Sequence, residues 1–103
     1  MNEKKCLSLL GIARKAGKIK SGEFQTETAI KKGDAFLVLV AEDASDNTRK
    51  KFSDQCAYRH VPVRSVFSKE ELGHAVGLEM RSALAVTDEG LAGSVLGILD
   101  GDG

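Results

Sequence analysis

The chain has 103 residues, 42% of them hydrophobic and 29% charged, which fits one soluble globular domain over residues 1–103. Its formal net charge is zero, yet residues 1–33 carry eight Lys or Arg against three acids, and residues 34–103 carry seven against twelve. No stretch approaches the ~20 apolar residues of a membrane helix, and aromatic residues, at 5%, are too few for a sheet of stacking aromatics. A signal peptide is not expected either, so we predict a cytoplasmic protein.

The first third of the chain alternates helix and strand signals. Apolar residues at helical spacing predict a helix over about residues 3–16, followed by a short extended segment at Ile19. Ser21 is placed to cap a second helix, which ends at Gly33. The continuous apolar run 36–41 predicts a strand buried on both faces.

The alternation continues to the C-terminus, where polar residues mark the starts of the helices. The remaining predicted elements are a helix begun by Ser45 or Asp46 and reaching Arg59, a strand over 61–66, a helix with a Ser68–Glu71 capping box that stops at Gly77, a strand over 83–86, and a helix begun by Asp88. Strands that alternate with helices predict an α/β fold, a three-layer α-β-α sandwich around a four-stranded, mostly parallel sheet.

Few residues suggest catalysis or cofactor binding. Cys6 and Cys56 are isolated and lie at apolar helix positions, which predicts buried, reduced thiols. The segment 17–22 fits the first six positions of a nucleotide-binding G-x-x-x-x-G-K-[ST] loop, but Glu23 stands where the phosphate-binding Lys is required. His60 and His74 stand alone and are predicted at the surface. We therefore expect a non-catalytic protein without cofactor or metal.

Two acidic pairs leave one catalytic alternative open. Glu42-Asp43 and Asp88-Glu89 each follow a predicted strand. In a parallel sheet their carboxylates would gather at one edge, where they could bind Mg²⁺. The simpler interpretation is that they lie in the first turns of the next helices, where acids complement the helix dipole.

The most informative segment is basic. It runs from Arg14 to Gly22 and contains four cations and no acid: Arg14, Lys15, Lys18 and Lys20. A cationic segment that leads into a helix N-terminus is suited to bind the phosphates of RNA. Alternatively, these side chains are ordinary solvated cations at a helix end. Glu23 opposes phosphate binding, since its carboxylate already interacts with the positive end of the helix dipole, where a phosphate would otherwise bind.

Several segments together resemble one protein family. They are Gly17–Gly22, Thr28–Gly33, Ala41–Ala44, Val61–Val63, Leu72–Gly77 and Ala85–Asp88. Their spacing resembles the kink-turn-binding ribosomal proteins, the large-subunit "L seven Ae / L thirty e" superfamily, over about residues 6–97. The chain looks most similar to the small bacterial ribosomal-protein-like members.

The resemblance implies the same sandwich, with a mixed sheet, and a function. Family members bind RNA that kinks at an internal loop with tandem sheared G·A pairs. The start of the second helix reads those purines, and a loop before the last strand covers an extruded base. The implied partner is structured RNA of this kind, in a ribosomal or other ribonucleoprotein context that links the protein to translation. Neither a membrane nor DNA is expected as a partner.

The family's reading motif, G-x-N-E-x-x-K, maps onto Gly22 and the residues after it. Gly22 matches, whereas Phe24 stands for Asn, Gln25 for Glu and Thr28 for Lys. Gly77 to Arg81 would form the covering loop. The RNA-binding residues implied by the motif and the basic segment are Arg14, Lys15, Lys18, Lys20, Ser21, Gly22, Phe24, Gln25, Thr28, Lys31, Lys32, Leu78, Glu79, Met80 and Arg81.

The three motif substitutions also support an alternative function. A chain that kept this fold but lost RNA recognition would serve as a protein-interaction module. An exposed Phe24 would suit a protein contact better than a solvated surface.

Overall fold

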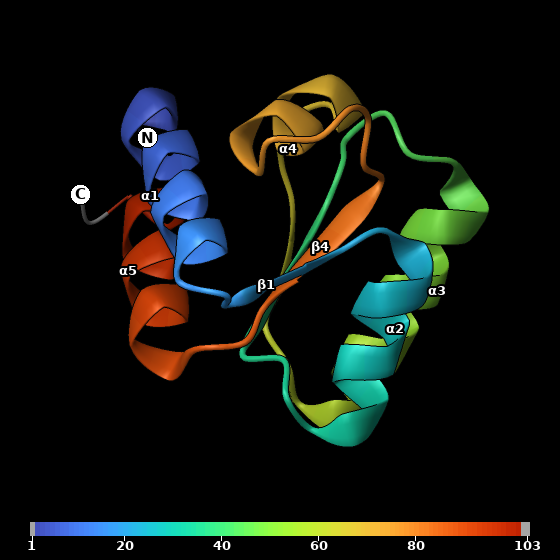
Figure 1. The fold of residues 1–103 in the computed structure, drawn as a ribbon. Coiled ribbons are helices and arrows are strands. Elements are labelled where there is room, and N and C mark those ends of the chain that lie inside the picture. The colour runs from blue at the N-terminus through green and yellow to red at the C-terminus, as the bar shows by residue number, and fades with distance from the viewer. Residues whose placement is uncertain (1, 102–103) are drawn as a thin grey trace.

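The computed structural model describes residues 2–101, and its helices and strands follow the predicted order (Figure 1). The elements are α1 (Glu3–Lys15), β1 (Ile19–Ser21), α2 (Glu23–Lys32), β2 (Leu37–Val40), α3 (Asp46–Arg59), β3 (Val63–Ser65), α4 (Lys69–Ala75), β4 (Ala83–Val86) and α5 (Glu89–Leu99). In these residues no helix combines the length and the hydrophobicity needed to cross a membrane.

The sheet is mixed, with strand order β1-β4-β2-β3. β2 pairs with β3 in parallel, whereas β4 is antiparallel to both β1 and β2. β1, β2 and β3 therefore run in one direction, as helix-linked strands should, and β4 is inserted between β1 and β2 in the opposite direction. The resemblance predicted this mixed sheet correctly; the mostly parallel sheet predicted from alternation was wrong because alternation does not fix the direction of an inserted strand.

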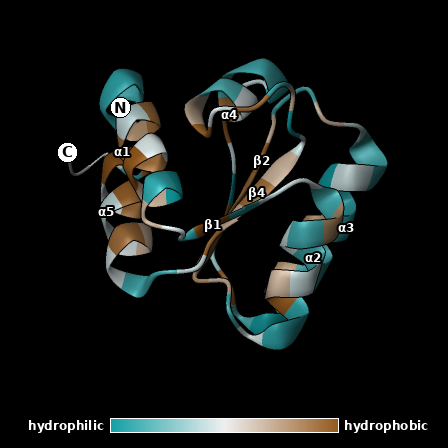
Figure 2. Cartoon of the chain, in the orientation of Figure 1, coloured by the Kyte–Doolittle hydropathy of each residue, from teal (hydrophilic) through white to brown (hydrophobic). Residues whose placement is uncertain are grey.

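Helices cover both faces of the sheet, which confirms the α-β-α sandwich. α2 and α3 lie on one face, and α1, α4 and α5 lie on the other (Figure 1). α5 is hydrophobic along most of its length, while α2 and α3 are largely hydrophilic (Figure 2). β2 and β4 are buried at every position, so the core lies around these two central strands.

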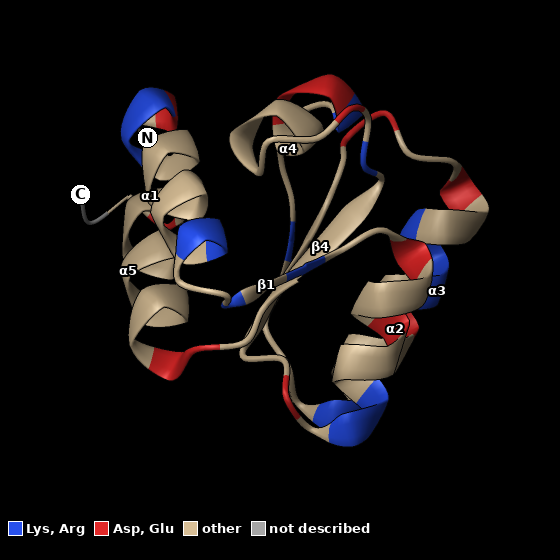
Figure 3. Ribbon diagram, in the orientation of Figure 1, with Lys and Arg blue, Asp and Glu red and all other residues tan. Residues whose placement is uncertain are grey.

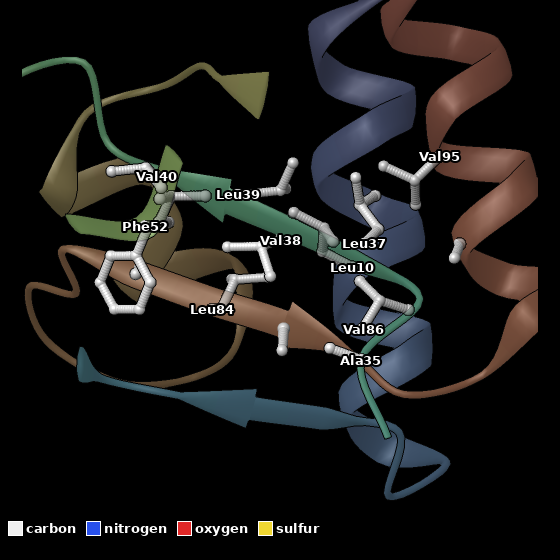
Figure 4. Close-up of a cluster of buried hydrophobic side chains, with 14 of the residues drawn as sticks. Leu10, Ala35, Leu37, Val38, Leu39, Val40, Phe52, Leu84, Val86 and Val95 are labelled. Carbon is white, nitrogen blue, oxygen red and sulfur yellow. The ribbon is translucent and has the colours of Figure 1, made fainter. Parts of the chain in front are cut away.

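One core cluster joins the layers. Leu10 of α1, Val95 of α5 and Phe52 of α3 all project into it beside the central strands (Figure 4). Cys6 and Cys56 are buried and free, as predicted. Burial raises the pKa of the Cys56 thiol to about 11, so this side chain stays protonated and unreactive at neutral pH.

Polar caps begin α3, α4 and α5 where the sequence predicted them. Ser45 accepts a hydrogen bond from the backbone N–H of Thr48, and Asp88 accepts one from that of Leu91. Ser68 and Glu71 form the predicted reciprocal capping box at the start of α4. Both histidines are exposed, as predicted.

Gly73 of α4 lets the following loop fold back against the helix. Its carbonyl oxygen accepts a hydrogen bond of 2.9 Å from the N–H of Leu78. A Cβ atom at position 73 would overlap the carbonyl group of Glu79. The backbone of the loop before β4 is therefore packed directly on Gly73, which sets the loop's position.

We predict that Gly73→Ala lowers the free energy of unfolding by about 3 kcal/mol or more, because the loop must be displaced to admit the methyl group. Gly93→Ala is the matched control, since Gly93 is exposed within α5 and a Cβ there meets no atom within 4 Å. The control should stabilise the protein by about 0.5–1 kcal/mol through helix propensity. Urea unfolding of both variants measures the difference, and equal effects would contradict the packing described.

Candidate functional site

The antiparallel pairing of β1 with β4 brings the start of α2 next to the start of β4. The N–H of Gly22 donates a 2.9 Å hydrogen bond to the carbonyl oxygen of Ala83. Gly22 has a φ of 93°, a conformation that favours glycine. A Cβ atom there would lie 4.0 Å from Cδ of Arg81. Thus two segments that the resemblance assigned to RNA binding, about 60 residues apart in the sequence, are in contact.

The N-terminus of α2 is open. Gly22, not Ser21, is its N-cap, and no side chain caps the first turn. The prediction of a Ser21 cap was wrong because Ser21 is the last residue of β1 and pairs with Leu84. The other four helices described between residues 2 and 101 each have a side-chain cap. The first N–H groups of α2 therefore remain available to an external acceptor.

The exposed face of α2 carries the substituted motif residues. Phe24 is 80% exposed. Gln25 and Thr28 line a shallow groove of about 90 Å³ together with Lys20 and Lys32. The Thr28 hydroxyl donates a 2.9 Å hydrogen bond to the carbonyl oxygen of Phe24, so its donor is used within the helix. Gln25 is exposed, so its amide group faces solvent on this side of the helix.

The loop from Gly77 to Arg81 ends beside the start of α2, where Arg81 lies next to Gly22. Met80 is 56% exposed and Leu78 37% exposed, so neither side chain belongs to the core. The N–H of Arg81 donates to the carbonyl oxygen of Lys69, and the Arg81 guanidinium donates to that of Met80. The first bond ties the end of the loop to α4, and the second is made within the loop.

The predicted cations do not all lie on one surface. Lys and Arg mark the end of α1, β1 and the C-terminal end of α2 (Figure 3). The Arg14 guanidinium lies beside Gly77, where a Cβ atom would be 3.3 Å from Nη1. Lys15, Lys18 and Lys20 are exposed. Lys31 instead lies on the side of α2 that faces α3, and its Nζ lies 3.1 Å from Oε1 of Glu27, one turn earlier in the same helix.

A pair of residues that the sequence did not reveal flanks the site on the α3 side. Nζ of Lys51 lies 3.1 Å from Oε1 of Glu23. The hydrogen bond to Glu23 is the main cause of the raised pKa of Lys51. Neither spacing nor composition signals this contact, because the two residues lie 28 positions apart on different helices.

The proposed cluster of four carboxylates does not form. Because β4 runs opposite to β2, the residues after the two strands lie at opposite edges of the sheet. Asp43 accepts a hydrogen bond from the N–H of Lys69, and Asp88 caps α5. Within residues 2–101, no three His, Cys, Asp or Glu side chains are grouped to bind a metal. The simpler interpretation holds for Asp88 and Glu89, which begin α5. It was wrong for Glu42 and Asp43, which precede the N-cap of α3, and Asp43 bonds to the start of α4 instead.

Comparisons with known proteins give one consistent result. The model of the ribosomal protein L7Ae/L30e/S12e/Gadd45 family matches residues 4–95. The RNA-binding protein YlxQ of Bacillus subtilis (strain 168) is 46% identical over 92 residues, which cover 89% of this chain and 92% of that protein. A YlxQ of Enterococcus faecium, also called an RNA-binding protein, is 36% identical over 100 residues, covering 97% and 96% of the two chains.

Solved structures share the fold. A protein of unknown function from Bacillus halodurans C superposes with a TM-score of 0.91 at 36% identity, over 95% of this chain and 99% of that one. The Giardia lamblia 15.5kD RNA binding protein superposes with a TM-score of 0.81 at 23% identity, over 97% and 91% of the two chains. The second similarity shows the fold alone.

Proposed function

Because the chain belongs to the ribosomal protein L7Ae/L30e/S12e/Gadd45 family, as its motifs indicated, we propose that it is a non-catalytic RNA-binding protein. Its proposed ligand is kink-turn or related internal-loop RNA in a ribosomal or other ribonucleoprotein context, and residues 1–103 act as one binding domain. The hydrogen bond from Gly22 to Ala83 carries the proposal, since it brings the open start of α2 beside the end of the loop before β4.

The start of α2 and the loop before β4 together suit an RNA internal loop. Such loops expose base edges that a regular A-form helix hides. Gln25 presents both an amide donor and a carbonyl acceptor to a purine edge, and the exposed ring of Phe24 offers a surface on which a base can stack. In the loop before β4, the exposed side chains of Leu78 and Met80 would pack on an extruded base, with Arg81 next to them in the chain.

Phosphate contacts orient the RNA on this site. Arg14, Lys15, Lys18 and Lys20 flank it on the α1 and β1 side (Figure 3), and the open N–H groups of α2 add donors at its centre. Such contacts fix register without reading sequence. Lys32 extends the cationic surface along the groove with Gln25. Lys31, paired with Glu27, is the weakest candidate in the set.

We predict that a short kink-turn RNA binds at least about tenfold more tightly than the same RNA with its G·A pairs replaced by Watson–Crick pairs. The reason is that the Watson–Crick pairs remove both the kink and the exposed purine edges. Titration of both RNAs at two salt concentrations measures the difference. Equal, strongly salt-dependent binding would instead indicate a generic phosphate surface. Absence of binding to both would favour the protein-interaction module, to be tested by partner capture.

We predict that Phe24→Ala weakens kink-turn binding by about 1–2 kcal/mol, the usual contribution of one stacked base. Tyr58→Ala is a matched control, because Tyr58 is 82% exposed but lies on α3, away from the site. Both side chains are solvent-facing, so thermal unfolding should change little in either variant. Fluorescence titration compares them, and an equal loss of affinity would exclude stacking on Phe24.

We predict that Lys18→Ala lowers affinity for both RNAs by a similar factor and reduces the slope of log affinity against log salt by roughly one, as loss of one phosphate contact does. Lys50→Ala removes a cation from α3, where its Nζ lies 3.0 Å from Asp54, and should change neither quantity. An unchanged slope in Lys18→Ala would remove Lys18 from the interface.

A further inference from the structure

The first turn of α2 contains an acid at the point where RNA phosphates would approach. Glu23 follows Gly22 directly, and its side chain is 42% exposed. A free carboxylate here would repel phosphate and compete for the open N–H groups of the helix. The structure instead places Oε1 of Glu23 3.1 Å from Nζ of Lys51, on the side of α2 that faces α3.

Lys51 is fixed in place by more than this one contact. Its Nζ also lies 3.5 Å from Oε2 of Glu27 and 4.9 Å from the ring centroid of the buried Phe52. Glu27 in turn accepts hydrogen bonds from Lys31 and Gln55, and the bond from Lys31 is the main cause of its lowered pKa. The ammonium group is therefore held between the two helices by several partners, ready to bind Glu23.

The same network divides α2 into two faces. Glu23, Glu27 and Lys31 point toward α3, where their charges are balanced. Phe24 is exposed, and Gln25 and Thr28 line the groove with Lys20. Glu23 therefore faces α3, whereas the residues of α2 that we propose to bind RNA face the groove or the solvent.

We propose that Lys51 is a positioning residue for RNA binding: it holds the Glu23 carboxylate against α3 and neutralises it, which keeps the start of α2 open to RNA. This inference rests on the proposed RNA-binding function. It assigns Lys51 no contact with RNA. Its effect must then pass through Glu23, since Glu27 keeps Lys31 and Gln55 as partners when Lys51 is lost. When the Glu23 carboxylate is removed, loss of Lys51 should no longer weaken RNA binding. If Lys51 instead bound phosphate directly, its loss would weaken binding whether or not the carboxylate is present.

The experiment compares four forms of the full chain, namely the wild type, K51M, E23Q and the double variant E23Q/K51M. Methionine keeps an unbranched side chain of similar length while removing the charge of Lys51 and its contact over the Phe52 ring. The matched control is K50M, which removes the neighbouring cation and leaves the pair of Lys51 and Glu23 intact. Each form is titrated with the kink-turn RNA at two salt concentrations, and its unfolding in urea is measured separately.

K51M should bind the RNA about five- to tenfold more weakly, since one unneutralised carboxylate then lies near the phosphates. E23Q and E23Q/K51M should both bind within about twofold of the wild type, and so should K50M. The salt slope of E23Q/K51M should equal that of the wild type, because no phosphate contact has been removed.

Other outcomes overturn the inference in distinguishable ways. If E23Q/K51M binds as weakly as K51M with a smaller salt slope, Lys51 contacts phosphate directly. If K51M binds as the wild type does, Glu23 needs no partner. If affinity in all forms simply follows the urea midpoint, Lys51 is only structural. A wild type that binds neither RNA overturns the proposed function and this inference together.

Discussion

The insertion of β4 between β1 and β2 is the constraint on which the candidate site depends. Since β4 is antiparallel to β1, its first residues meet the last residues of β1. The loop that precedes β4 therefore lies beside Gly22, from which α2 begins. A parallel β4 would have placed this loop at the opposite edge of the sheet. The direction of one buried strand thus joins two distant segments into one surface, and it also separates the two acidic pairs.

The start of α2 differs from the other described helix starts because no side chain accepts hydrogen bonds from its first N–H groups. Four helices use a side chain to accept the first N–H groups, which is the usual way to stabilise a helix by about 1 kcal/mol. α2 has Gly22 there, and forgoes this stabilisation. Its position is maintained elsewhere, by the buried Thr26, Ala29 and Ile30 and by the ion pairs to α3. An open helix start held by its neighbours is well suited to receive an acceptor from a ligand.

Local patterns were enough to predict the elements. The uninterrupted apolar residues of β2, the capping box at Ser68 and the Asp88 cap each determine a structure within a few residues, and all three predictions were confirmed. The same local rules correctly gave the parallel order of β2 and β3. Only the family resemblance indicated a mixed sheet, because strand insertion is decided by the packing of the whole sheet and not by any one segment.

The candidate site was less predictable, for a related reason. The resemblance assigned both Gly22 and the loop before β4 to RNA binding, and the end of this loop lies beside Gly22 in the fold. The number of cations, however, did not show which way each one faces: Lys31 and Lys32 are adjacent in sequence, yet they line different grooves on either side of α2. The partner of Glu23 was also missed, since Lys51 becomes its neighbour only when α3 packs on α2. A charge count gives the net charge of a segment. The electrostatic potential at a site depends instead on which surface of the folded protein each charged side chain occupies.

The motif substitutions change the kind of recognition that this surface supports. Phe24 replaces an amide by a ring, and Thr28 replaces a cation by a hydroxyl whose donor is already used within the helix. Stacking on a ring tolerates any base, and phosphate contacts carry no sequence information. Base identity would therefore be read chiefly by Gln25, the one motif position with a free amide. On the proposed mode of binding, selectivity then comes mainly from the shape of the RNA, since only a sharply kinked loop can place a base against Phe24 and an extruded one against Met80 at the same time.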